Sequence, residues 1–107
     1  MEYRFNGNNF TDEVIKSEIP VMIDFYAEWC GPCRMMSPVV EKFAEEYDGR
    51  VKIGKINVDE ESDLAERFGV QSIPSFVFIK DGRVVDRVTG AMPGPVLKNY
   101  LEDLAAG

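Results

Sequence analysis

Both cysteines of the chain, Cys30 and Cys33, lie where a predicted strand leads directly into a predicted helix. Residues 21–26 are almost wholly apolar, as a central strand that is covered on both faces should be. From residue 36 to residue 47, apolar side chains recur at intervals of three or four residues, which indicates an amphipathic helix. This junction restricts the fold more than any other feature, because a Cys-x-x-Cys pair between a strand and a helix is typical of α/β proteins.

The other strands and helices are predicted from apolar spacing and from turn-forming residues. Asp81-Gly82, between two apolar runs, is a strong signal of a β-hairpin. Strands separated by helices run parallel through right-handed crossovers, whereas the hairpin adds an antiparallel edge. We therefore expect a single α/β domain over residues 1–107, a mixed five-stranded sheet flanked by four helices. The predicted strands cover residues 2–5, 21–26, 51–58, 76–80 and 83–88, and the predicted helices cover residues 9–17, 34–47, 60–68 and 95–104.

Charge and hydropathy exclude several classes of partner. The net charge is −7, from 12 basic and 19 acidic residues, and no basic patch appears, so neither nucleic acid nor an anionic membrane is an expected partner. No apolar stretch reaches the roughly 20 residues of a membrane span. The first residues carry neither the basic region nor the apolar region of a signal peptide. These observations predict a cytoplasmic protein, although a targeting segment removed during maturation remains an alternative.

The position of the two cysteines predicts thiol–disulfide chemistry. A helix N-terminus offers unpaired backbone N–H groups and the positive end of the helix dipole, which favour a thiolate over a thiol. The thiolate is the nucleophile in thiol–disulfide exchange. We expect Cys30, ahead of the helix, to be the more exposed sulfur and the attacking one, and Cys33 to be the more buried, resolving one. Between them, Pro32 suits a first helical turn and Gly31 lets a substrate backbone approach.

Two other interpretations of the cysteine pair remain open. Zinc is the first, since Cys-x-x-Cys is also half of a zinc site. Such a site takes four ligands, and the chain has two cysteines and no histidine, so only a dimer that shares one metal could complete it. The second is a pair of free structural thiols. A structural disulfide is disfavoured, because closing so short a loop removes little chain entropy.

Asp24 is the most informative residue outside the cysteine pair. It interrupts the apolar run of residues 21–26, where an unpaired carboxylate is costly. A buried carboxyl group has a raised pKa and can exchange protons near neutrality, which suits a proton acceptor. The alternative is a carboxylate that reaches solvent at the end of the strand.

Several segments, in this order along nearly the whole chain, resemble the thioredoxin family of the Trp-Cys-Gly-Pro-Cys type. The residues that carry the resemblance are Asp24–Cys33, Lys55–Asp59, Phe68–Val70 followed by Ile73–Ser75, Lys80–Gly82, and Gly90–Ala91. The chain departs from the family pattern at Tyr26, where a second tryptophan is common, and at Thr89, where the substrate groove is usually apolar. These departures concern the choice of partner rather than the sulfur chemistry.

The resemblance implies roles for residues that local sequence leaves undecided. It implies that Asp24 lies beneath Cys33 with Lys55 as its partner, although Lys55 taken alone would be a solvated lysine. It also implies that Pro74 follows a cis peptide bond and faces the disulfide, so that the backbone before it pairs with an extended substrate. Taken alone, Gly90 would equally be an ordinary turn residue. The implied substrate-binding residues are Trp29, Ile73, Pro74, Gly90 and Ala91, beside Gly31 and Pro32.

The function implied by the resemblance is that of a general protein-disulfide reductant and electron carrier. Its electrons reside in the Cys30/Cys33 dithiol, so no bound cofactor and no metal is expected. A thioredoxin reductase would restore the dithiol, and the other partners would be disulfide-containing substrate proteins. The protein itself would be a monomer. Two alternatives remain: an oxidase or isomerase on the same fold, and a binding module in which redox activity is incidental.

Overall fold

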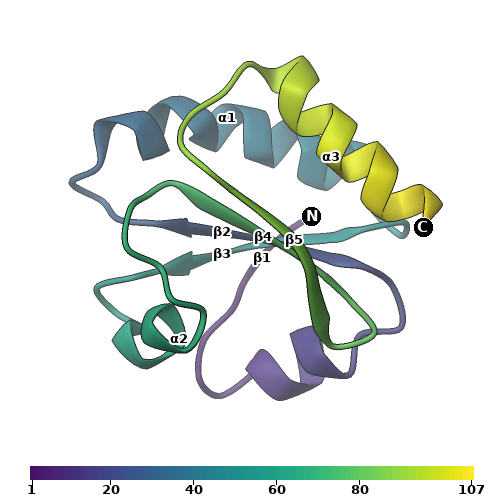
Figure 1. Cartoon of the computed structure of the whole chain (residues 1–107), viewed down its shortest axis with the longest axis horizontal. Coiled ribbons are helices and arrows are strands. Elements are labelled where there is room, and N and C mark those ends of the chain that lie inside the picture. The colour runs from purple at the N-terminus through teal and green to yellow at the C-terminus, as the bar shows by residue number, and fades with distance from the viewer.

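The computed structural model describes residues 1–107 as one mixed sheet with helical segments on both faces (Figure 1). The predicted order of strands and helices is confirmed. In chain order the elements are β1 (Glu2–Arg4), η1 (Thr11–Ile15, a short π-helix), β2 (Val21–Tyr26), α1 (Gly31–Glu46), β3 (Lys52–Asn57), α2 (Ser62–Arg67), β4 (Ser75–Lys80), β5 (Arg83–Thr89) and α3 (Gly94–Ala106).

The sheet has the spatial order β1-β3-β2-β4-β5, with β2 at its centre. β3 runs parallel to both β1 and β2, whereas β4 is antiparallel to β2 and to β5. The expected mixture of parallel strands and an antiparallel hairpin edge is therefore confirmed. All six residues of β2 are buried, which explains why this strand is almost wholly apolar in sequence.

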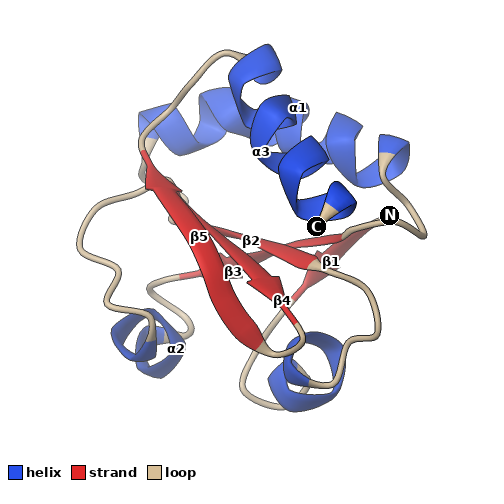
Figure 2. Ribbon diagram, turned by 45° about the vertical axis from the view of Figure 1, so that its right-hand side comes forward, coloured by secondary structure: helices blue, strands red, loops and turns tan.

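The helices form two layers. α1 and α3 cover one face of the sheet, and α2 and η1 lie against the other (Figure 2). Side chains alternate between the faces along β2, because successive residues of a strand point to opposite sides. Met22 packs in the apolar cluster beneath α1 and α3, whereas Ile23 and Phe25 pack in the cluster on the opposite face. Asp24 therefore points toward α1, the helix that carries the cysteines.

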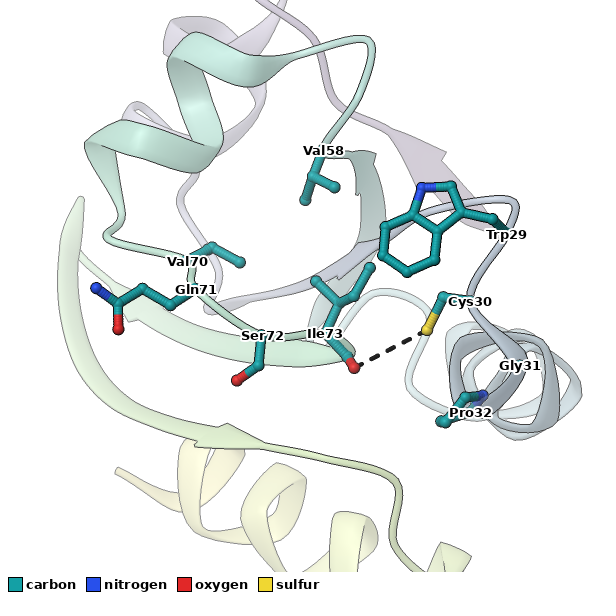
Figure 3. Close-up of a pocket in the computed structure, with 9 residues that line it drawn as sticks. All are labelled: Trp29, Cys30, Gly31, Pro32, Val58, Val70, Gln71, Ser72 and Ile73. Carbon is teal, nitrogen blue, oxygen red and sulfur yellow. Dashed lines mark hydrogen bonds between the residues drawn. The ribbon is translucent and has the colours of Figure 1, made fainter.

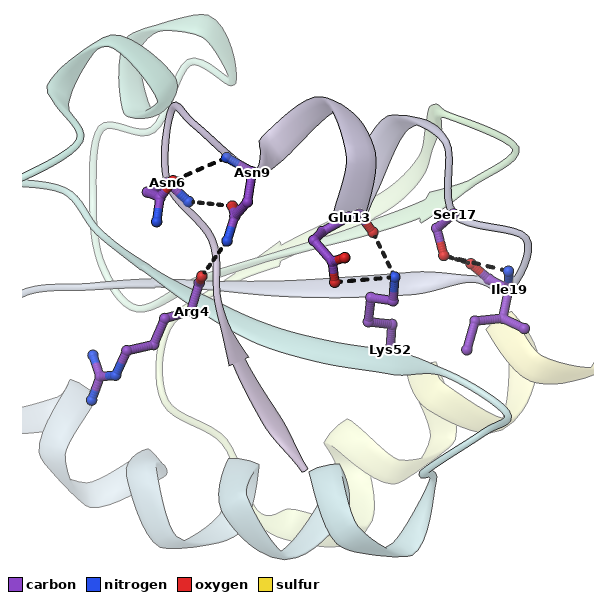
Figure 4. Close-up of polar contacts among 7 residues, drawn as sticks. All are labelled: Arg4, Asn6, Asn9, Glu13, Ser17, Ile19 and Lys52. Carbon is purple, nitrogen blue, oxygen red and sulfur yellow. Dashed lines mark hydrogen bonds and ion pairs between the residues drawn. The ribbon is translucent and has the colours of Figure 1, made fainter.

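The connection from β1 to η1 is held by its own polar groups (Figure 4). The side chain of Asn9 accepts a hydrogen bond from the backbone of Asn6 at 2.8 Å and donates one to the carbonyl oxygen of Arg4 at 2.9 Å. On the other side of η1, Lys52 Nζ donates to the carbonyl oxygen of Glu13 at 3.0 Å and ties η1 to the start of β3. These contacts hold the turn that leads from β1 into η1 and attach η1 to β3.

Candidate active site

The first turn of α1 places Cys30 at the N-cap position. The helix begins at Gly31, three residues earlier than predicted, because Pro32 lies in the first turn, where its missing N–H would have no helical partner. Cys30 itself is extended, with φ −87° and ψ 110°, and its sulfur accepts a hydrogen bond from the backbone N–H of Cys33 at 3.2 Å. A sulfur in this position meets the unpaired N–H groups and the positive end of the helix dipole, which stabilise negative charge.

Cys30 and Cys33 are joined by a disulfide, with their Cα atoms 5.2 Å apart. The interpretation as free structural thiols is therefore wrong. In this oxidised state each cysteine residue is 4% exposed, so the expectation that the Cys30 sulfur is the more exposed of the two stays a prediction for the reduced protein. The two cysteines form one buried cluster with Tyr26 and Ala27, against which Val58 and Ile73 pack. The two sulfurs differ in what they border, since Cys30 lines an apolar groove and Cys33 lines a polar pocket that contains Asp24.

The groove beside Cys30 has a volume of about 470 Å³ (Figure 3). The Trp29 indole and the side chains of Val58 and Ile73 converge on the space next to the sulfur. The Sγ atom of Cys30 lies 3.9 Å from the carbonyl oxygen of Ile73. Four residues that the resemblance implied, Trp29, Gly31, Pro32 and Ile73, line the groove together with four that it did not imply, Val58, Val70, Gln71 and Ser72.

The other three residues predicted to bind substrate lie next to this groove but do not line it. The Ile73–Pro74 peptide bond is cis, as the resemblance implied. The backbone N–H of Gly90 donates to the carbonyl oxygen of Pro74 at 2.8 Å. This hydrogen bond places Gly90, and Ala91 after it, next to the proline. The role of these three residues in substrate binding stays a prediction.

Trp29 forms the exposed rim of the groove. Its side chain is 69% exposed, and the indole Nε1–H donates to the carboxylate of Asp59 at 2.9 Å. This hydrogen bond ties the indole to the segment that follows β3. A large apolar ring thus stays at the surface, next to the sulfur that we expect to react.

Asp24 is buried on the far side of the disulfide, so the alternative of a carboxylate that reaches solvent is wrong. The residue is 2% exposed, and its Oδ1 atom has no hydrogen-bond partner. Burial raises the pKa of Asp24 to about 7, the positive charge of Lys55 opposes this effect, and the Glu2 carboxylate adds to it. Asp24 and Cys33 both line a polar pocket of about 140 Å³. The carboxyl group therefore lies where it could accept a proton from Cys33 near neutral pH.

Lys55 is the direct cross-strand neighbour of Asp24 in the pairing of β2 with β3. No hydrogen bond or ion pair joins the two side chains, and Lys55 acts on the carboxyl group only through its charge. Its Nζ atom instead lies 4.5 Å from the centre of the Tyr26 ring. The resemblance thus predicted the right neighbour, while the contact itself differs.

Comparison with known proteins agrees with this geometry. The family model Thioredoxin matches residues 3–103 of the chain. Thioredoxin 1 of Nostoc sp. is 45% identical over 95 residues, which cover 89% of each chain. Thioredoxin 1 of Synechococcus elongatus is 48% identical over 93 residues, which cover 87% of each chain. The thioredoxin of Chlorobaculum thiosulfatiphilum is 42% identical over 101 residues, which cover 94% of each chain.

The chain belongs to the thioredoxin family. With its disulfide-bonded pair at the start of α1, this thioredoxin-family protein is a protein-disulfide oxidoreductase that functions as a disulfide reductase. Its partners include substrate proteins that contain disulfide bonds.

Proposed function

We propose that the protein is a general disulfide reductant in which Cys30 attacks the substrate and Cys33 resolves the adduct. The observation that carries this order is the hydrogen bond from the Cys33 backbone N–H to the Cys30 sulfur, at 3.2 Å. In the reduced protein the same donor and the helix dipole would stabilise a thiolate at Cys30. That thiolate attacks one sulfur of the substrate disulfide. A mixed disulfide forms, and the other substrate sulfur leaves as a thiolate.

The second step uses Cys33 and Asp24. The Asp24 carboxylate accepts the proton of the Cys33 thiol, either directly or through water in the pocket that both residues line. The Cys33 thiolate then attacks the sulfur of Cys30, and the remaining substrate sulfur leaves as a thiolate. Two electrons have passed from the dithiol to the substrate, and the Cys30–Cys33 disulfide remains. The positive charge of Lys55 opposes the rise in the pKa of Asp24 that burial causes, so that the carboxylate form is present near neutral pH.

The substrate would occupy the groove beside Cys30 as an extended segment. Main-chain groups next to Pro74 would provide hydrogen bonds that do not depend on substrate sequence. The remaining contacts would be apolar, from Trp29, Pro32, Ile73 and Ala91, with Gly31 and Gly90 allowing close approach. Such a surface accounts for a broad range of substrate proteins.

After each cycle a separate enzyme must return two electrons and two protons to the disulfide. We propose that this enzyme is a thioredoxin reductase, of either the NADPH-dependent flavoprotein type or the ferredoxin-dependent type. None of the helices combines the length and the apolar character needed to cross a membrane. We further propose that the protein acts as a monomeric single domain in the cytoplasm, with no bound cofactor.

An insulin-reduction assay tests this function, run once with each of the two types of reductase as the source of electrons. We expect sustained reduction with one of them, and we expect Cys30→Ser to lower the rate to the background of the reductase alone. Val85→Ser, on the exposed face of β5, serves as the control and should retain the full rate. Equilibration with glutathione separates a reductant from an oxidase, since the disulfide of a reductant resists reduction by the glutathione pool. Full activity in the Cys30→Ser variant would contradict the assigned nucleophile.

A further inference from the structure

Tyr26, the last residue of β2, contacts two cations, one from β1 and one from β3. Arg4 Nη1 donates a hydrogen bond to the Tyr26 hydroxyl at 3.0 Å, and Lys55 Nζ lies 4.5 Å from the centre of the ring. The strand register explains this arrangement, because Arg4 of β1 pairs with Lys55 of β3, and Lys55 pairs in turn with Asp24 of β2. One row across the sheet thus holds Arg4, Lys55 and Asp24 on the face toward α1.

The position of Arg4 is fixed at both ends of the residue. Its carbonyl oxygen accepts the hydrogen bond from the Asn9 side chain, and its guanidinium points away from that turn (Figure 4). The guanidinium is thereby left to bind the Tyr26 hydroxyl. Tyr26 itself is 8% exposed, so its ring is enclosed by protein and has little freedom to turn.

Lys55 therefore has the buried carboxyl group of Asp24 as its cross-strand neighbour, but its ammonium group contacts the Tyr26 ring. A lysine and an aspartate paired across adjacent strands, with both side chains on one sheet face, can reach each other, since adjacent strands lie about 4.8 Å apart. Here Asp24 Oδ1 has no hydrogen-bond partner, and the Lys55 ammonium instead lies over the negative face of the Tyr26 ring.

We propose that Arg4 and Tyr26 are positioning residues that hold the Lys55 ammonium over the Tyr26 ring and so prevent it from forming an ion pair with Asp24. This inference rests on the proposed role of Asp24 as proton acceptor. An ammonium in direct contact would stabilise the carboxylate far more than one held at a distance. Asp24 would then be a weaker base toward the Cys33 thiol near neutral pH.

The charges that surround Asp24 come from each element packed against it. Glu2 and Arg4 lie on β1, Lys55 on β3, Glu28 in the loop before α1, and Arg34 on α1. Glu2 opposes ionisation of Asp24, and its own Oε2 atom is buried without a hydrogen-bond partner. Arg34 is engaged elsewhere, since its Nη1 donates to the Glu28 carbonyl oxygen at 2.8 Å. Lys55 is therefore the cation whose release would change the charge at Asp24 most.

Carbon-13 NMR of the Asp24 carboxyl group in the oxidised protein, recorded across pH, tests the proposal without any turnover. We expect Tyr26→Leu, which removes the ring, to make the acid dissociation constant of Asp24 at least about tenfold larger. Tyr26→Phe keeps the ring but loses the hydroxyl that Arg4 binds, so it should enlarge the dissociation constant in the same direction as Tyr26→Leu and by less. Arg4→Met removes the same anchor together with a positive charge near Asp24, whose loss acts in the opposite direction, so its increase should be the smallest of the three.

Removal of the Tyr26 ring could change the dissociation constant of Asp24 in two ways, by releasing Lys55 or by admitting water to the carboxyl group. Repeating the substitution in a protein that lacks the Lys55 charge separates these two causes. In a Lys55→Gln background, Tyr26→Leu should leave the dissociation constant of Asp24 unchanged. The same increase in both backgrounds would overturn the proposal, as would no increase in the wild-type background. If Tyr26→Leu fails to fold, Tyr26→Phe replaces it: it should enlarge the dissociation constant in the wild-type background and leave it unchanged in the Lys55→Gln background. A confirmed change together with an unaltered pH–rate profile in Asp24→Asn would refute the proton-acceptor role alone.

Discussion

Replacement of Cys33 by serine is expected to convert the protein into a trap for its substrates. Cys30 would still attack a substrate disulfide, but no second thiol would lie next to the mixed disulfide to resolve it. The intramolecular attack owes its rate to the proximity of the two residues, whose Cα atoms are 5.2 Å apart, and an external thiol at ordinary concentration cannot replace it. Catalytic turnover should fall to background, while covalent complexes accumulate up to one substrate per protein molecule.

Non-reducing electrophoresis of the Cys33→Ser variant, incubated with insulin or with a cell extract, measures this outcome. The adducts should disappear on treatment with dithiothreitol. Cys30→Ser is the control, because it lacks the proposed nucleophile and should form no adducts. Adducts formed by Cys30→Ser but not by Cys33→Ser would show that the order of the two cysteines is reversed.

Replacement of Asp24 by asparagine should stabilise the protein strongly at alkaline pH and hardly at all at acidic pH. The pKa of Asp24 is about 7 in the folded protein, compared with 3.8 for a free side chain. The unfolded chain therefore loses its proton first as the pH rises, so stability falls between about pH 4 and pH 7 and stays low above that range. At about 1.4 kcal/mol per pH unit, the free energy of unfolding of Asp24→Asn at pH 8 should exceed that of the wild type by on the order of 4 kcal/mol.

Denaturant unfolding of the oxidised protein at pH 4 and at pH 8 provides the measurement. Asp81→Asn is a suitable control, because Asp81 is exposed in the hairpin turn with φ 52°, a conformation that asparagine also tolerates. This control should change the free energy of unfolding little at either pH. Equal stability of Asp24→Asn and the wild type at pH 8 would contradict a buried carboxyl group with a raised pKa.

The sequence predicted the central strand better than the start of the following helix. Val21–Tyr26 was predicted with the correct ends, because a strand buried on both faces gives an unbroken apolar run. α1 was predicted to begin at Arg34 but begins at Gly31. Glycine and proline usually interrupt helices, and here proline occupies the first turn, the one position where a helix accepts it without loss of a hydrogen bond.

Parts of the site were predictable because their signals are local. The spacing of Cys30 and Cys33 and the lone carboxylate in an apolar strand are both visible in the sequence. Val58 and Val70 carry no such signal, since they reach the groove only through the packing of neighbouring loops. The contact of Lys55 with Tyr26 likewise depends on the register of β2 and β3, which apolar spacing alone does not determine.

Alkylation of the reduced protein by iodoacetamide tests most directly the central claim, that the start of α1 stabilises a reachable thiolate at Cys30. The reaction is followed as a function of pH, and mass spectrometry identifies the labelled residue. We predict a single label on Cys30, with half-maximal reactivity at least about one pH unit below the value of about 8.5 for a free cysteine, and Cys33 protected over the same period. Equal and slow labelling of both residues, half-maximal at or above that value, would show that the start of α1 does not stabilise a reachable thiolate.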